Sequence, residues 1–95
     1  MKQFIINDPG GYVGMHIMQG KIYAAMKAKL IVVYCASACL NMLAQVPVDN
    51  VCFKPSAWIG YHTAKFDGIH PESPTTMRWE RGTDWIARGW AACSP

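Results

Sequence analysis

The sequence has few charged residues and no long hydrophobic run, and each absence excludes a class of protein. Charged residues make up 16% of the 95 residues, and 9 Lys and Arg against 6 Asp and Glu give a formal net charge of +3. This excess is small and scattered, without the basic runs of a nucleic-acid-binding surface. The longest apolar candidate, residues 30–34, has the length of a strand, whereas a membrane-spanning helix needs about 20 residues. We therefore expect no nucleic-acid and no membrane partner.

Signals for export and for cofactors are also missing. The N-terminus has one lysine and then a three-residue apolar run, residues 4–6, whereas a signal peptide needs about 7–15 apolar residues. This pattern predicts a cytoplasmic protein. Residues 10–14 do not form the G-x-G-x-x-G fingerprint, and no Gly-Lys-Ser/Thr follows them. We expect no cofactor.

The 4 cysteines, Cys35, Cys39, Cys52 and Cys93, lack the spacing of a zinc site. We therefore expect no bound metal. Two disulfides are possible in principle, but in a reducing compartment such cysteines are more often packed thiols.

What the sequence does contain is apolar surface. Hydrophobic residues make up 52% of the chain, which excludes disorder as its main state, and the length allows one small domain, residues 1–95. The pattern predicts a strand at residues 4–6, a helix at 12–27, a buried strand at 30–34, a helical segment at 35–45, and strands at 51–53 and 57–61. In the first helix Met15, Met18, Ile22 and Met26 form one apolar face, and its glycines suggest close packing on a sheet.

This order, β-α-β-α-β-β, predicts parallel strands joined by right-handed crossovers. Residues 63–76 hold two of the 6 prolines and are predicted to form an exposed loop. Thr83 is a candidate cap for a last helix at residues 84–92.

Three short segments carry the functional signal. Residues 7–11, Asn-Asp-Pro-Gly-Gly, can present backbone N–H groups to an oxyanion, although a tight strand-to-helix turn also explains them. Ser37 follows the buried strand, in the position of a nucleophilic serine or of a helix N-cap. His62 ends an apolar strand and is a candidate base, or only a partly exposed histidine. Cys35 and Cys39 are weaker nucleophile candidates, because nothing marks either thiol as acidic.

Taken in order, these segments resemble the Clp-type serine proteases of the ClpP/crotonase superfamily. That family has an N-S-P-G-G-like turn, an A-S-A or A-S-M nucleophile segment and a histidine ending a later strand, which residues 6–11, 36–38 and 59–62 match with similar gaps. The Cys-Ala-Ser-Ala-Cys form is most similar to a small periplasmic-type branch of Clp-like proteins. The resemblance covers about residues 4–64. It implies an α/β fold, a truncated ClpP/crotonase-like β-α-β-α-β-β unit with a C-terminal loop and helix at residues 65–95.

The resemblance also implies roles for individual residues. Ser37 would be the nucleophile and His62 the general base, with the backbone N–H groups of Gly11 and Ala38 as oxyanion donors. A structural role is the better explanation of the mid-helix His16.

The sequence departs from the family at two places. Asp8 stands where the family usually has serine, a change that a turn tolerates. The family's third triad residue, an acid, lies farther beyond the histidine than this sequence extends. Asp84 and Asp67 are the available substitutes, and Asp84 is preferred because it begins the last predicted helix.

The strand at residues 4–6 would leave an open sheet edge, which a homo-oligomer would cover, and the family assembles into rings. Trp79, Trp85 and Trp90 are then candidate interface anchors, or equally a satellite core. An unfoldase or another protein partner is compatible with this resemblance.

Three functions remain open on the sequence. A serine peptidase acting on peptide or protein substrates is slightly favoured. A catalytically silent Clp-like interaction module, viral or phage-encoded given its small size, is the main alternative. A crotonase-like enzyme acting on acyl-CoA is the least favoured, because the serine and histidine fall where the proteases have them.

Overall fold

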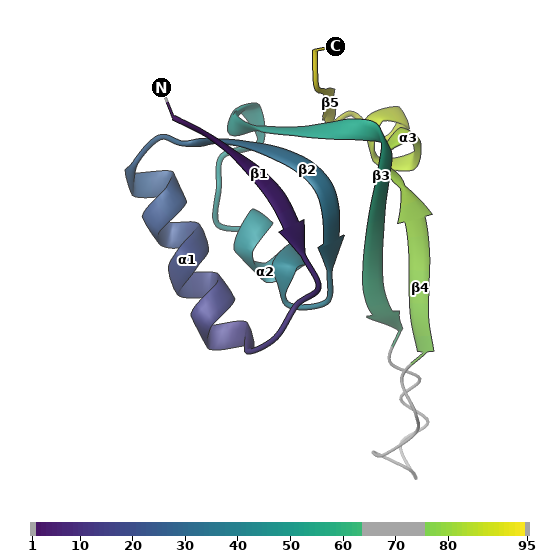
Figure 1. Cartoon of the computed structure of the whole chain (residues 1–95), viewed down its shortest axis with the longest axis horizontal. Coiled ribbons are helices and arrows are strands. Elements are labelled where there is room, and N and C mark those ends of the chain that lie inside the picture. The colour runs from purple at the N-terminus through teal and green to yellow at the C-terminus, as the bar shows by residue number, and fades with distance from the viewer. Residues whose placement is uncertain (1, 64–75, 95) are drawn as a thin grey trace, which may run out of the picture.

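The computed structural model describes residues 2–63 and 76–94 (Figure 1). These residues form a mixed α/β fold with a mostly parallel, 5-stranded sheet. The elements in chain order are β1 (Gln3–Asp8), α1 (Val13–Ala25), β2 (Lys29–Ala36), α2 (Cys39–Leu43), the 3₁₀ turn η1 (Val48–Asn50), β3 (Val51–Thr63), β4 (Thr76–Arg81), α3 (Gly82–Ala87) and β5 (Ala91–Ala92).

The sheet has the strand order β1-β2-β3-β4, and β5 pairs with β3. β1 with β2 and β2 with β3 are parallel, which confirms the pairing expected for strands joined through helices. β4 is antiparallel to β3. Because β1, β2 and the second half of β3 run in the same direction, their carboxyl ends meet at one edge of the sheet (Figure 1).

The core lies between this sheet and its helices. The largest fully buried side chains of the sheet are Leu30, Val32, Val51, Phe53 and Ile59. The α2 side chains Met42 and Leu43 are buried against them. The apolar run of β2 therefore supplies buried side chains to the core between the sheet and the helices.

Phe53 also anchors the C-terminal segment. Its ring lies 5.3 Å from the rings of both Trp85 and Trp90, measured between centroids. These two tryptophans pack against the core, as the satellite-core interpretation expected, whereas Trp79 is 43% exposed.

The two strands predicted at residues 51–53 and 57–61 are in fact one bent strand, β3 (Figure 1). Its register against β2 jumps from Phe53, opposite Val32, to Trp58, opposite Tyr34. Pro55 lies in the stretch that this jump leaves out of the ladder, where its missing N–H costs no hydrogen bond. The proline thus bends the strand without ending it.

The apolar face predicted for the first helix is correct in its spacing and wrong in its orientation. Met15 and Met18 on α1 are 70% and 64% exposed. The buried side is instead at Gly20, where an added Cβ would lie 2.4 Å from the Met42 carbonyl oxygen. α1 therefore packs closely on α2 through a glycine, and its methionines face outward.

The C-terminal prediction needs a correction as well. Residues 76–81 form a strand, β4, and the last helix covers Gly82–Ala87 rather than residues 84–92. Its N-cap is Arg81 and not Thr83, since the Arg81 N–H donates to the Asp84 carboxylate at 2.8 Å. After the helix, Gly89 adopts a φ of +111° and turns the chain into β5. The loop predicted at residues 63–76 lies, apart from its ends, outside the described residues.

The expectation of packed thiols is wrong. Cys35 bonds to Cys39, and Cys52 bonds to Cys93. The second bridge has a sequence separation of 41 and ties the segment after β5 to β3. Four cysteines allow three pairings, and sequence alone does not choose among them.

Candidate active site

Ser37 lies in a strained turn at the carboxyl end of β2. It has a φ of 56°, in the left-handed region that residues other than glycine rarely occupy. The turn is held on both sides, since Ser37 N–H donates to the Gly60 carbonyl at 2.8 Å and the Leu40 N–H donates to the Ser37 carbonyl at 3.0 Å. A hydroxyl group on such a strand-to-helix turn projects from the edge of the sheet, as nucleophilic serines do.

β3 brings His62 to this serine. The pairing of Ala36 with Gly60 places His62 two residues farther along the adjacent strand. The His62 Nε2 lies 3.1 Å from the Ser37 Oγ, within hydrogen-bond distance. The structure thus brings together the two residues that the sequence singled out as nucleophile and base.

The Asp-Pro-Gly-Gly turn lies against the same serine. A Cβ added to Gly10, whose φ is +100°, would lie 2.9 Å from the Ser37 Cβ and 2.7 Å from the Ala36 carbonyl oxygen. Only glycine therefore lets this turn approach the serine so closely. The Gly10 N–H is already used, because it donates to the Asp8 Oδ1 at 2.8 Å.

The two predicted oxyanion donors lie in the two turns that meet beside Ser37. Within residues 2–63 and 76–94, the N–H groups of Gly11 and Ala38 make no backbone hydrogen bond. The Ala38 nitrogen lies 3.4 Å from the Cβ position of Gly10, so the two donor segments face each other beside Ser37. Free donors at this place match what a developing oxyanion needs.

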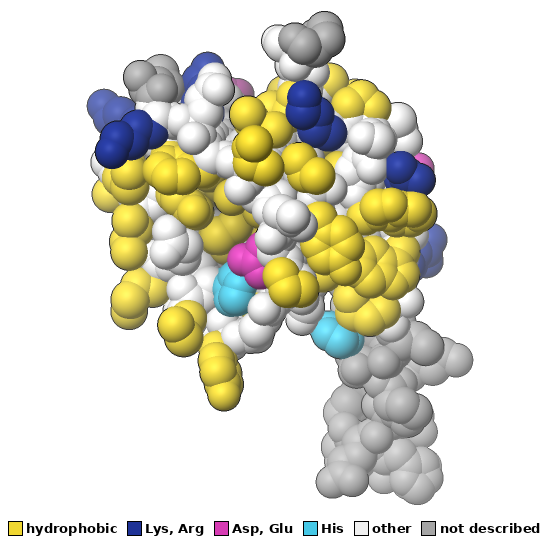
Figure 2. Space-filling view, viewed as in Figure 1, with side chains coloured by type: hydrophobic (Ala, Val, Ile, Leu, Met, Phe, Trp, Pro, Cys, Tyr) yellow, Lys and Arg dark blue, Asp and Glu magenta, His cyan; other side chains and the backbone are white. Residues whose placement is uncertain are grey.

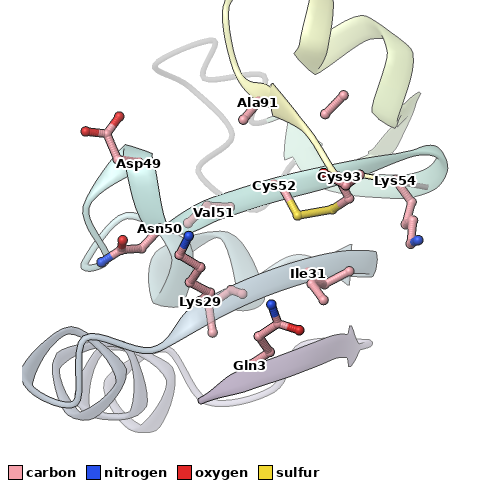
Figure 3. A pocket seen from close by; sticks show the side chains of 13 residues that line it. Gln3, Lys29, Ile31, Asp49, Asn50, Val51, Cys52, Lys54, Ala91 and Cys93 are labelled. Atoms are coloured by element: carbon pink, nitrogen blue, oxygen red, sulfur yellow. A yellow bond between two sulfur atoms is a disulfide. The ribbon is translucent and has the colours of Figure 1, made fainter. Parts of the chain in front are cut away.

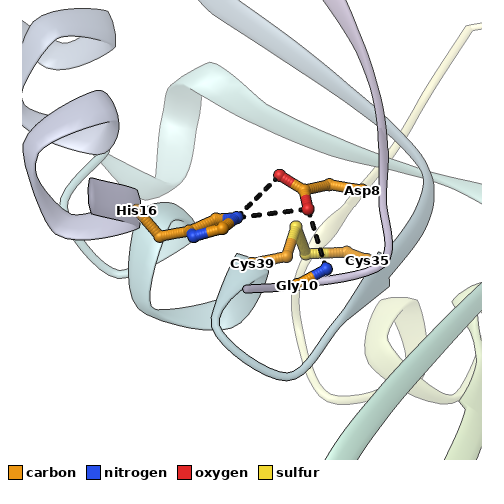
Figure 4. The surroundings of a disulfide bond; sticks show 5 residues. All are labelled: Asp8, Gly10, His16, Cys35 and Cys39. Carbon is orange, nitrogen blue, oxygen red and sulfur yellow. Dashed lines mark hydrogen bonds and ion pairs between the residues drawn. A yellow bond between two sulfur atoms is a disulfide. The ribbon is translucent and has the colours of Figure 1, made fainter. Parts of the chain in front are cut away.

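His16 is the functional candidate that sequence reasoning set aside. Its Nε2 lies 3.0 Å and 3.2 Å from the two carboxylate oxygens of Asp8 (Figure 4). Its Nδ1 lies 2.8 Å from the Tyr12 carbonyl oxygen. The hydrogen bond to Tyr12 raises the pKa of His16 above its ordinary value, and Asp8 acts in the same direction while burial opposes both. A signal for this pair is present in the sequence: Asp8 stands just before the glycines of the turn, and His16 lies one helical turn after Tyr12, at the start of the next helix.

The structure does not bring Asp84 to His62. The Asp84 carboxylate caps α3 at Arg81, and Arg81 pairs with Trp58, whereas His62 pairs with Met77 farther along the ladder. Four residues of strand separate these two pairs, roughly 13 Å at the usual rise. The prediction that Asp84 is the third triad residue is therefore wrong. Asp67 lies outside the described residues, and among the described ones no acid side chain bonds to His62.

A disulfide encloses the serine. Cys35 and Cys39 stand two residues before and after Ser37, with their Cα atoms 5.3 Å apart, and the bridge lies next to Asp8 and Gly10 (Figure 4). The bond removes both thiols as nucleophiles. It also fixes the two ends of the strained turn relative to each other.

An apolar surface adjoins the serine and histidine. Figure 2 shows hydrophobic side chains gathered over β3 and β4. Trp58 and Trp79 make a T-shaped contact there with ring centroids 6.5 Å apart, and Tyr34 lies 5.6 Å from Trp79. Because Trp58, Gly60 and His62 alternate along β3, they share one sheet face. A substrate bound at Ser37 would meet this aromatic surface.

A cavity of about 420 Å³ lies elsewhere in the molecule (Figure 3). It is lined by the beginnings of β1, β2 and β3, including Gln3, Lys29 and Asn50, and by the Cys52–Cys93 bridge. Since Ser37 and His62 do not line it, this cavity is separate from the candidate active site.

The part of the chain that the structure describes holds no group of three or more His, Cys, Asp or Glu side chains arranged for a metal ion. In the same residues, no helix is long and apolar enough to cross a membrane. Comparisons with protein-family models, with curated proteins and with solved structures found no match for this chain.

Proposed function

We propose that this chain is a Clp-like serine peptidase that hydrolyses peptide bonds through an acyl-enzyme on Ser37. The observation that carries the proposal is the 3.1 Å contact between the Ser37 Oγ and the His62 Nε2, formed on a turn with a φ of 56°. A nucleophile and a base within hydrogen-bond reach, joined to two free N–H donors, are the parts that acyl transfer requires.

The chemistry follows from this arrangement. The Ser37 oxygen attacks the peptide carbonyl carbon while the neutral His62 imidazole takes the hydroxyl proton at Nε2. The negative charge that develops on the carbonyl oxygen is held by the N–H groups of Gly11 and Ala38. His62 then gives the proton to the leaving amine. In the second half, His62 takes a proton from a water molecule, whose oxygen attacks the ester carbonyl carbon. The bond to the Ser37 oxygen then breaks, the acid is released, and His62 returns its proton to the Ser37 oxygen.

Among the described residues this is a Ser-His dyad, since none of their acid side chains orients His62. In a well-built triad, replacing the acid by its amide lowers turnover roughly 10⁴-fold. We therefore expect slow turnover, with the oxyanion donors supplying much of the rate enhancement.

A catalytically silent Clp-like interaction module is the alternative function. The observation that favours it is that, among the residues that the structure describes, no acid side chain bonds to the exposed His62. The two functions differ in whether Ser37 reacts with an electrophile.

A fluorophosphonate probe followed by mass mapping of the labelled residue separates them. A serine peptidase is labelled at Ser37, and the Ser37→Ala variant is not labelled. Ser56→Ala is the matched control, because Ser56 is an exposed serine on the bend of β3 and should leave labelling unchanged. Labelling elsewhere, or none on a folded wild type, would reject the peptidase.

We further propose that the protein is a homo-oligomer. Support for assembly comes from β1, which lies at an open edge of the sheet, and from the exposed apolar side chains of α1. The two disulfides favour an oxidising compartment over the cytoplasm expected from the sequence, because such bonds persist mainly in oxidising compartments.

A further inference from the structure

His16 has hydrogen-bond acceptors at both of its ring nitrogens. A carbonyl oxygen faces Nδ1 at 2.8 Å, and a carboxylate faces Nε2 at 3.0 Å. Neither partner can donate a hydrogen bond, so both nitrogens must carry a proton for both bonds to form. The geometry therefore favours the charged imidazolium form of His16, paired with the Asp8 carboxylate.

Asp8 connects this cation to the oxyanion turn. Its Oδ1 accepts the Gly10 N–H at 2.8 Å while the same carboxylate holds His16 from α1. The His16 side chain is 14% exposed and that of Asp8 29% exposed, so water screens the pair only in part. One carboxylate thus fastens the turn to the first turn of the helix.

The turn and the histidine also touch directly. A Cβ added to Gly11 would lie 3.4 Å from the His16 Cε1, and one added to Gly10 would lie 2.9 Å from the Ser37 Cβ. The turn is therefore held between His16 on one side and Ser37 on the other.

Few other charges face this pair. The remaining charged residue of α1, Lys21, is five positions away, and α2 carries no charged residue, its Cys39 being bonded to Cys35. Without the His16 charge, the Asp8 carboxylate would be an uncompensated negative charge beside the place where the oxyanion forms.

We infer that Asp8 and His16 are the positioning pair of this site: their ion pair fixes the Asp-Pro-Gly-Gly turn against Ser37, occupies the Gly10 N–H and leaves the Gly11 N–H for the oxyanion. This inference rests on the proposed function of Ser37. Neither residue touches the reacting atoms, and both act through the position of the turn and through its charge.

The test compares wild type with Asp8→Asn and His16→Gln, which remove one charge each, and with His16→Lys, which keeps the cation. Asp49→Asn is the matched control, because Asp49 is an exposed acid in η1. Loss of a positioned donor affects the transition state more than the bound substrate. We expect kcat for ester hydrolysis to fall about 10- to 100-fold in Asp8→Asn and His16→Gln, with KM within about threefold.

The pH profile adds a readout that a structural role would not move. Activity of the wild type should fall as the pH rises through the raised pKa of His16, and His16→Lys should move that fall to higher pH. Wild-type kcat and an unchanged pH profile in Asp8→Asn and His16→Gln would overturn the inference.

A wild type that the fluorophosphonate probe does not label at Ser37 would refute the proposed function. The Asp8–His16 pair can then still be tested by NMR, without any measurement of activity. The amide signal of Gly11 should shift as His16 titrates in the wild type and should lose that response in His16→Gln. A Gly11 amide that does not respond to that titration would overturn the pair as a positioning device, whatever the protein's activity.

Discussion

At the scale of single residues, the site depends on contacts that only particular side chains can make. Ser37 needs a left-handed backbone, Gly10 needs the absence of a Cβ, and His16 needs two protons. The first two follow from a strand-to-helix turn and could be anticipated from the small residues around them. The third could not, because the hydrogen bonds of His16 come from a carbonyl oxygen and a carboxylate that meet only in the folded chain.

His16 makes stability depend on pH in a defined direction. Its pKa is raised in the folded protein, so its contribution to the free energy of unfolding is complete below the ordinary value of 6.5 and is lost as the pH rises through the raised pKa. As the pH rises from below 6.5 through the raised pKa of His16, we expect the Tm of the wild type to fall more than that of His16→Gln. Thermal melts by circular dichroism check this, and parallel curves for the two proteins would contradict it.

At the scale of elements, the two glycines of α1 differ in the space around their Cβ positions. Gly14 has open space around its Cβ position, whereas a Cβ at Gly20 would meet the Met42 carbonyl oxygen at 2.4 Å. Gly14→Ala should stabilise the protein by roughly 1 kcal/mol through helix propensity. Gly20→Ala should destabilise it by about 1–3 kcal/mol, because α1 must move away from α2. Urea unfolding of both variants measures the difference, and equal stabilisation would show that the helices are not in close contact.

The sequence predicted the elements that follow a clear pattern, and it missed those whose pattern is set by tertiary partners. The β-α-β-α-β order and the meeting of Ser37 with His62 follow from parallel strands that end at one edge. β4 was missed because its core-facing Glu80 is charged, and that charge is tolerated only through the partner Arg88 from beyond α3. The orientation of α1 was missed because a glycine, and not the methionine face, makes the close contact.

At the scale of the whole molecule, the Cys52–Cys93 disulfide holds the chain's C-terminal segment to β3. Its sequence separation is 41, against 4 for Cys35–Cys39. Because loop-closure entropy grows with loop length, replacing Cys52 and Cys93 by alanine should cost about 2–4 kcal/mol, and replacing Cys35 and Cys39 should cost less. Chemical denaturation of the two double variants measures this. A larger loss of stability on removing Cys35–Cys39 than on removing Cys52–Cys93 would contradict this account.

The exposed face of α1 predicts the assembly state. If the homo-oligomer buries this face, sedimentation equilibrium should give a mass above the 10.6 kDa of one chain. Met18→Lys with Ile22→Lys should shift the protein to the monomer, since each places a charge in an apolar contact. Gln19→Lys, on the same helix but in a polar position, is the control. A monomeric wild type would remove the proposed oligomer.

The central claim is that Ser37 and His62 work together as nucleophile and base, and its most direct measurement is the formation of the acyl-enzyme. Wild type mixed with p-nitrophenyl acetate should release a burst of nitrophenol stoichiometric with the protein and gain one acetyl group at Ser37 by mass spectrometry. Ser37→Ala should show neither, and His62→Ala should slow the burst by orders of magnitude while keeping its fold. A wild type that shows no burst and no acetyl group on Ser37, or a His62→Ala variant that acylates at the wild-type rate, would contradict the claim.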